Sequence, residues 1–197
     1  MTITASVVKE LRDRTGAGMM DCKKALQECD GDMDRSVDFL RSKGAAAAAK
    51  RAGRDAKEGL IHPYIHPGSR LGVMVEVNCE TDFVARTDDF RDLAHSIAMH
   101  VAAAGPLSIR REDLDETTVD REREVYAQQA RETGKPENVV EKIIEGKMAK
   151  WFGEACLLEQ AFVRDPDVTV GELVTNAAAK LGENVTIRRF VRFQLGD

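Results

Sequence analysis

The sequence predicts an α+β fold, in which a small three-stranded antiparallel sheet is packed by helices and follows an N-terminal three-helix domain. Three observations support this class. Alternating apolar residues at 71–79 predict a strand, and the turn residues before it predict a hairpin. A second alternating run at 185–195 predicts the third strand. The segments between these strands carry apolar residues at spacings of three and four, as amphipathic helices do.

Residues 1–44 are predicted to form the three-helix domain. Its first helix is expected to stop at Thr15-Gly16-Ala17-Gly18, and its second at Asp30-Gly31. Asp32 is a good N-cap for the third helix, and Gly44 is expected to end it. A domain of this length is near the lower limit for folding without metal or disulfides, so we expect it to be only modestly stable.

Residues 45–58 are alanine-rich and carry interleaved basic residues. Alanine favours helix, but no apolar stripe is present to dock this segment, so we expect a partly helical, solvated linker. Contact with a phosphate backbone is the alternative. Asp55 and Glu58 dilute the positive charge, and no aromatic residue is present to stack on bases.

Residues 59–197 are predicted to form the α+β core, which begins with the hairpin. Pro63 cannot donate to a strand ladder, so the first strand is expected at a sheet edge. The apolar residues expected on one face of the second strand are Leu71, Val73, Val75, Val77 and Cys79. The third strand is expected to place Val185, Ile187, Val191, Phe193 and Leu195 on one face.

Four helices are expected in this core. One runs from Thr87 to Gly105 and buries a single face against the hairpin. A charged helix at about 118–132 precedes one with a strong apolar stripe, which a core-facing position explains. Residues 156–163 are expected to be extended or looped. Thr169 and Glu172 have the spacing of a capping box at the start of the last helix.

Composition restricts the possible functions. The formal net charge is only −5, so overall charge gives no case for direct nucleic-acid binding. The four cysteines form no C-x-x-C pair, which argues against a zinc site or a disulfide framework. No apolar run reaches the roughly 18 residues that a membrane span needs, and the N-terminus lacks a signal-peptide pattern. We expect a cytoplasmic protein without a cofactor.

The sequence also lacks the signs of an enzyme. It contains no phosphate-binding glycine motif and no nucleophile elbow. His62 and His66 would lie roughly 13 Å apart on an extended strand, too far to share a metal. His95 and His100 differ by five residues on a helix and point apart. We therefore expect no catalytic residues and no metal site.

Phe83 lies on the turn between the second strand and the following helix. A large apolar side chain at such a place either fills the core or contacts a partner, and general burial statistics favour the core. However, residues 78–86, Asn-Cys-Glu-Thr-Asp-Phe-Val-Ala-Arg, resemble the signature of the bacterial elongation factor Ts family. This resemblance favours contact with a partner.

Three further segments are similar to the same family, in the family's order. They are residues 11–26, 134–148 and 188–193. The resemblance implies an N-terminal fold related to ubiquitin-associated domains. It also implies that the protein is not an enzyme, but a guanine-nucleotide exchange factor for the translation GTPase elongation factor Tu.

The family resemblance assigns roles to particular residues. It implies that a four-residue segment disturbs the magnesium site of the GTPase so that GDP is released: Thr81, Asp82, Phe83 and Val84. It implies that three N-terminal residues dock on the nucleotide domain of the GTPase: Arg12, Met19 and Met20. Adjacent methionines cannot both face the core of their own helix, and an exposed methionine suits an adaptable contact.

The chain resembles the short form of the family. It has one strand hairpin where longer members have a duplicated core region with a helical-hairpin insertion and a C-terminal module. We therefore expect a symmetric homodimer that binds two partner molecules. Its interface is predicted on the sheet face opposite the core, at Ile61, Ile65, Met74 and Phe190.

Two other functions remain open at this point. One is a plain protein-interaction module with a ubiquitin-associated-like headpiece. The other is an RNA-binding or ribosome-associated factor that uses the basic linker.

Overall fold

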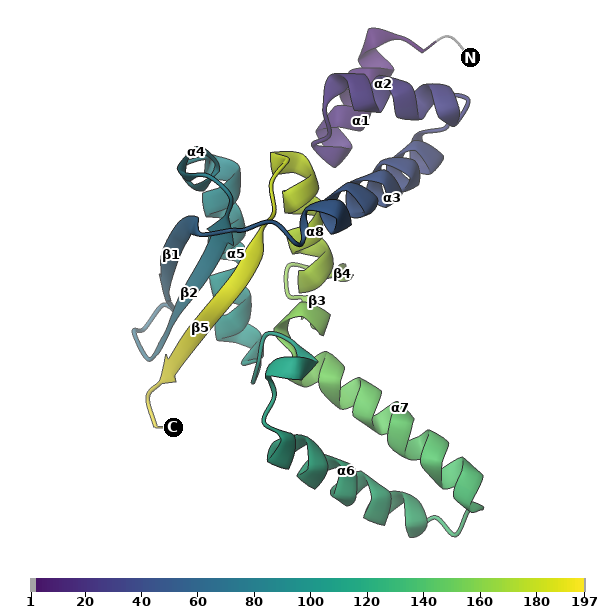
Figure 1. Ribbon diagram of the computed structural model, residues 1–197, viewed down its shortest axis with the longest axis vertical. Helices are drawn as coiled ribbons and strands as arrows, with labels where there is room; N and C mark the ends of the chain where they lie inside the picture. Colours follow the sequence, from purple (N-terminus) through teal and green to yellow (C-terminus); the bar gives the residue numbers. More distant parts are fainter. Residues whose placement is uncertain (1–2, 197) are drawn as a thin grey trace. The chain divides into compact units, whose positions relative to one another are not determined.

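The computed structural model describes residues 3–196 and has the predicted α+β class. Figure 1 follows the chain from the N-terminal helices to the last strand. Contacts divide the chain into two compact units, each made of three segments. One unit comprises the chain up to Leu60, Val77–Leu93 and Val174–Arg188. The other comprises Ile61–Glu76, Ala94–Leu173 and the chain from Arg189 onward.

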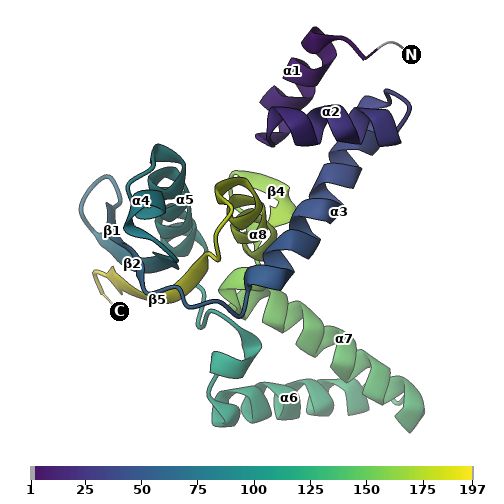
Figure 2. The ribbon, with the colours of Figure 1, turned by 45° about the horizontal axis from the view of Figure 1, so that its top comes forward.

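The main sheet has the strand order β1 (Glu58–Ile65), β2 (Leu71–Cys79) and β5 (Thr186–Gln194). The three strands are antiparallel and lie side by side in Figures 1 and 2. The predicted hairpin is confirmed, since the His66 N–H donates to the Leu71 carbonyl at 2.9 Å. β1 is an edge strand, as its proline predicts. Of the residues predicted to share a face of β2, four are at most 2% exposed: Val73, Val75, Val77 and Cys79.

α5 (Asp88–Ala104) is the predicted long helix, and its apolar stripe is buried. Its side chains contact the sheet directly: His95 Nδ1 lies 3.1 Å from His62 Nε2 of β1. From β5, Arg192 Nε donates to the Ala102 carbonyl at 3.4 Å. We call the side of the sheet that faces α5 the covered face and the opposite side the outer face.

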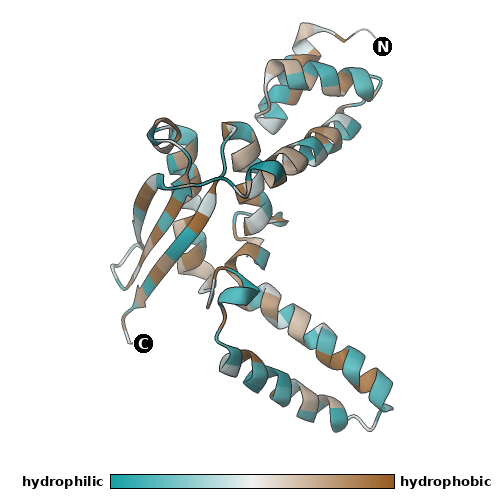
Figure 3. Ribbon diagram, in the orientation of Figure 1, coloured by the Kyte–Doolittle hydropathy of each residue, from teal (hydrophilic) through white to brown (hydrophobic). Residues whose placement is uncertain are grey.

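α6 (Glu116–Arg131) and α7 (Glu137–Ala155) form an antiparallel helical hairpin, visible in Figures 1 and 2. Hydrophilic residues cover most of α6 in Figure 3. Ala130 of α6 and Val140 and Met148 of α7 are at most 3% exposed, so the apolar stripe on α7 is partly buried, and α6 is its main neighbour. The core-facing position expected for α7 is therefore wrong. The resemblance to the short form implies that the helical-hairpin insertion of longer members is absent, and this expectation is wrong too. A helix that carries an apolar stripe can bury it against a neighbouring helix as well as against a core.

Residues 156–169 hold more structure than their sequence pattern indicates. Leu157–Glu159 forms a short 3-10 turn, and a similar turn at Arg111–Asp113 precedes α6. β3 (Ala161–Phe162) then pairs antiparallel with β4 (Asp165–Thr169). The chain thus has a second, two-stranded sheet besides the predicted one. α8 (Val170–Leu181) follows β4 directly. Its capping box is confirmed, with Glu172 N–H donating to Thr169 Oγ1 at 3.1 Å and Thr169 N–H to Glu172 Oε2 at 2.9 Å.

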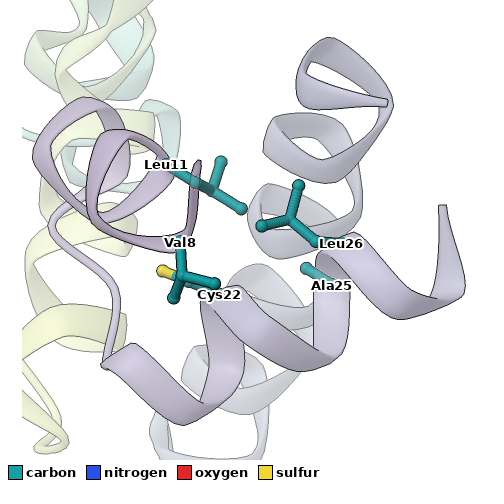
Figure 4. Packing of buried hydrophobic residues seen from close by; sticks show 5 residues of the cluster. All are labelled: Val8, Leu11, Cys22, Ala25 and Leu26. Atoms are coloured by element: carbon teal, nitrogen blue, oxygen red, sulfur yellow. The ribbon is translucent and has the colours of Figure 1, made fainter. Parts of the chain in front are cut away.

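The N-terminal helices are α1 (Ala5–Thr15), α2 (Met19–Glu28) and α3 (Met33–Arg51). Asp32 caps α3 as predicted, since its Oδ1 accepts the Arg35 N–H at 2.9 Å. Gly16 adopts φ 67° after α1, a conformation that favours glycine. Five buried residues of α1 and α2 form a small apolar cluster (Figure 4): Val8, Leu11, Cys22, Ala25 and Leu26. Met33, Val37 and Leu40 of α3 pack against this cluster and so join the third helix to the other two.

α3 does not end at Gly44, as the sequence predicted, but continues through the alanine-rich segment to Arg51. Gly44 has a packing role instead. A Cβ atom at this position would lie 3.1 Å from the Cβ of Ala179, so the missing side chain allows α3 to approach α8 closely. The helix continues because the alanines after Gly44 more than offset the propensity cost of a single glycine.

Candidate functional site

The segment that follows β2 forms a short turn, Thr81–Val84, at the start of the one-turn helix α4 (Asp82–Ala85). Thr81 is the N-cap, and its Oγ1 accepts the Val84 N–H at 3.4 Å. Ala85 is 8% exposed and attaches the helix to the interior, whereas Phe83 is 79% exposed. Phe83 therefore does not fill the core of its own chain. No other large apolar side chain among residues 3–196 is more exposed.

The carboxylate of Asp82 lies beside this aromatic ring in sequence and forms an ion pair. Its Oδ2 is 2.7 Å from Arg86 Nη2, and the side chains are 45% and 73% exposed. A pair this accessible contributes about 0–1 kcal/mol, so a partner can draw the Asp82 carboxylate away at little cost. The turn thus presents an aromatic ring and a weakly paired carboxylate together.

The groups around the turn do not support covalent or metal chemistry. Burial, followed by the charge of Glu183, raises the pKa of the Cys79 thiol to about 11, so it stays protonated at neutral pH. In the separate contact between β1 and α5, burial and the neighbouring His95 lower the pKa of His62. Within the described part of the chain, no three His, Cys, Asp or Glu side chains gather as a metal site would need.

A second set of exposed side chains lies at the corner between α1 and α2. Arg12 is exposed, and its carbonyl accepts the Gly16 N–H at 2.7 Å, which starts the turn into α2. Met19 and Met20 open α2 and are 42% and 76% exposed. Next to them lies a shallow depression of about 450 Å³, lined by Met20, Asp21, Lys23, Lys24, Gln27, Glu28 and Lys43. Charged side chains beside an exposed methionine are suited to contact with a protein partner.

The outer face of the sheet carries a third set. Its exposed apolar side chains, at 48% to 68% exposure, are Ile61, Ile65, Met74, Phe193 and Leu195. A groove of about 560 Å³ runs between Ile65, Met74 and Phe193. Exposed apolar side chains gathered in this way are typical of interaction surfaces.

Phe190 is not among the exposed side chains of this face. Arg189 Nε donates to Glu76 Oε2 at 2.7 Å, and Glu76 alternates with the buried valines of β2, so Arg189 lies on the outer face. Arg192 contacts α5 on the covered face. Phe190 therefore shares the covered face with Arg192 and is only partly exposed, while Phe193 and Leu195 lie outside. The alternation along β5 thus places Val191 and Phe193 on the outer face together with Arg189.

Comparisons with known proteins now identify the family. Residues 46–197 match the family model described as elongation factor TS. The chain is 58% identical over 195 residues to an elongation factor Ts of Carboxydothermus hydrogenoformans, and the matched residues cover 99% of this chain and 90% of that protein. It is 56% identical over 196 residues to one of Desulfosudis oleivorans, covering 100% and 99% of the two chains.

The chain belongs to the elongation factor Ts family. It is therefore a translation elongation factor, and the resemblance expected from four short segments extends over the whole chain. None of the helices in residues 3–196 has the length and apolar character needed to cross a membrane.

Local structure brings together two of the three predicted sets of contact residues. Residues 81–84 share one turn, and Arg12, Met19 and Met20 flank one corner. Sequence reasoning missed Glu183, which accepts hydrogen bonds from Glu80 and Thr81. No signal in the sequence points to this residue, because its partners lie 102 and 103 positions away.

Proposed function

We propose that this chain promotes the release of GDP from elongation factor Tu by protein–protein contact, which allows GTP to bind. It would act as a guanine-nucleotide exchange factor and not as an enzyme. The observation that carries the proposal is the 79% exposure of Phe83 on a hydrogen-bonded turn, within the family's signature. The fold keeps this apolar ring in water, so its burial by a partner lowers the free energy of the complex.

The mechanism we propose acts on the magnesium ion of the partner. In GTPases this ion bridges protein and phosphate oxygens, so its displacement leaves the phosphate charge poorly compensated. Phe83 would enter between side chains of the GTPase, and Asp82 would leave Arg86 to interact with groups that hold the ion. Thr81 and Val84 would fix the approach of the ring, since both belong to the cap of α4.

Thermodynamic linkage sets a requirement on this contact. The factor by which the exchange factor weakens GDP binding equals the factor by which GDP weakens binding of the exchange factor. A contact equally favourable in both states would shift nothing. The Thr81–Val84 turn must therefore fit the nucleotide-free GTPase better than the GDP-bound one.

Docking would use the corner between α1 and α2. Arg12, Met19 and Met20 are exposed there, and we propose that they bind the nucleotide domain of the GTPase. We keep the domain boundaries predicted from the sequence as part of this proposal. Residues 1–44 would dock on the GTPase, residues 45–58 would connect the domains, and residues 59–197 would carry out the exchange.

The outer face supports a homodimer and a complex of two chains with two GTPase molecules. Ile61, Ile65 and Met74 are exposed on it, as the interface requires, and Phe193 takes the place expected for Phe190. We propose a cytoplasmic site of action without direct nucleic-acid contact, which agrees with the net charge of −5.

Stopped-flow release of a fluorescent GDP analogue from elongation factor Tu tests the proposal. The wild-type chain should accelerate release strongly, and Phe83→Ala should reduce the acceleration at least tenfold, because hot-spot side chains contribute at least about 2 kcal/mol. Leu107→Ala is the matched control, since Leu107 is 64% exposed but lies in none of the three sets. If Phe83→Ala releases GDP as fast as wild type, the assignment of this ring is wrong.

The same assay separates the alternatives. A plain interaction module would bind elongation factor Tu, or another protein, without accelerating GDP release. An RNA-binding factor would show affinity for RNA that falls steeply with salt concentration.

A further inference from the structure

The turn between α8 and β5 contributes a carboxylate to the Thr81–Val84 turn. Glu183 Oε2 accepts the backbone N–H groups of Glu80 and Thr81, both at 3.0 Å. Glu183 Oε1 accepts the Thr81 hydroxyl at 2.6 Å. One anionic side chain therefore binds three donors from two consecutive residues, and hydrogen bonds to an ionised acceptor are stronger than neutral ones.

The contact is reciprocal. Glu80 Oε1 accepts the Asn184 backbone N–H at 2.6 Å, so each of the two neighbouring segments supplies a carboxylate to the backbone of the other. Asn184 Nδ2 in turn donates to the Arg54 carbonyl at 2.8 Å, just beyond the end of α3. Both segments are held although their residues are more than 100 positions apart.

The orientation of Phe83 depends on these bonds because α4 cannot hold itself. It has four residues, which is a single turn, and an isolated turn of helix is unstable. Its fixed points are the buried Ala85 at one end and the N-cap Thr81 at the other. Glu183 binds both the backbone N–H and the hydroxyl of Thr81, and so determines where the turn begins.

We propose that Glu183 is a positioning residue for GDP release, which orders the Thr81–Val84 turn before the GTPase binds. This inference rests on the proposed function. A turn ordered in the free protein loses less conformational entropy when it enters the partner, so more of the contact free energy acts on the nucleotide site. Glu183 acts through Phe83 and touches neither the GTPase nor the nucleotide.

GDP release measured over a range of exchange-factor concentrations tests this role. Glu183→Ala should lower the maximal rate about tenfold, while the half-saturating concentration stays within threefold, since Arg12, Met19 and Met20 are unchanged. Glu183→Gln keeps one carbonyl acceptor and should give an intermediate rate. Glu141→Ala, which removes an exposed carboxylate from α7, is the matched control and should release GDP at the wild-type rate.

A double-mutant cycle shows whether Glu183 acts through Phe83. Glu183→Ala should have less than a twofold further effect in the Phe83→Ala background, because the ring that it positions is already absent. Amide hydrogen exchange of the free protein should be faster at Glu80 and Thr81 in Glu183→Ala, with unchanged exchange in α6. If Glu183→Ala does not fold, the same comparisons are made with Glu183→Gln.

The outcomes distinguish this inference from the proposed function. Independent effects of Glu183→Ala and Phe83→Ala would overturn the positioning role. A slow Phe83→Ala together with a wild-type Glu183→Ala would overturn the role of Glu183 alone. A wild-type rate for Phe83→Ala would instead overturn the assignment of the ring on which both proposals rest.

Discussion

Removing one aromatic ring from the outer face should disrupt the proposed dimer. Phe193 is 68% exposed. With about 200 Å² for a whole phenylalanine side chain, roughly 140 Å² of it is available for burial, which corresponds to about 3.5 kcal/mol. In a symmetric dimer the same side chain is buried twice, so the upper limit is about 7 kcal/mol. Alanine retains part of this area, and water stays in contact with the edge of an interface. We therefore expect Phe193→Ala to weaken the free energy of dimerisation by about 3 kcal/mol, which raises the dimer dissociation constant roughly 150-fold.

Sedimentation velocity across a concentration series measures this effect. The wild-type chain should sediment as a dimer at micromolar concentration, and Phe193→Ala as a monomer over most of the same range. Phe83→Ala is the control, because it removes a phenylalanine that is at least as exposed but lies outside the outer face, and it should leave the dimer intact. A wild-type monomer at tens of micromolar, or an unchanged dissociation constant for Phe193→Ala, would refute the reasoning.

Three further predictions concern stability. Phe83→Ala should change the free energy of unfolding by less than about 0.5 kcal/mol, whereas Phe90→Ala, at a fully buried position, should lower it by about 3–5 kcal/mol in urea titrations. Gly59→Ala should lower the free energy of unfolding by more than about 2 kcal/mol, because φ is 143° and a Cβ would lie 2.1 Å from the Val77 carbonyl oxygen. Gly134→Ala has φ 66° but open space around it, and should lower the same quantity by about 1 kcal/mol. Thermal unfolding measures both. Burial lowers the pKa of His100 from its usual 6.5, and its Nδ1 accepts the Val163 N–H. Just below pH 6.5 the histidine is therefore protonated in the unfolded chain but still neutral in the folded one. Stability should thus be full above pH 6.5 and fall as the pH drops below it, and the slope should be smaller in His100→Gln.

The sequence predicted best those features that depend on near neighbours. Alternation at period two placed Val73, Val75 and Val77 on the buried face of β2, because successive strand residues point to opposite sides. The capping box of α8 and the N-cap Asp32 followed from side chains that bond to backbone groups three residues away. The family signature likewise located the Thr81–Val84 turn from contiguous residues.

The sequence predicted less well where the packing partner lies far along the chain. An apolar stripe on α7 indicates burial but not against what, and its neighbour is α6. Gly44 is a helix end by local rules but a close contact with Ala179 in the fold. On β5 only long-range contacts show which side is covered: Arg189 bonds to Glu76 on the outer face and Arg192 bonds to α5 on the covered face. The exposed ring of the outer face is therefore Phe193 and not Phe190.

By itself, the sequence determined the fold class, most of the helices and strands, and the segment that bears the family signature, because these depend on local periodicity and contiguous residues. The tertiary structure alone decided that Phe83 points into solvent and that Glu183 holds the turn beneath it. Exposure and long-range hydrogen bonds depend on which segments the folded chain brings together, and no spacing along the sequence records that.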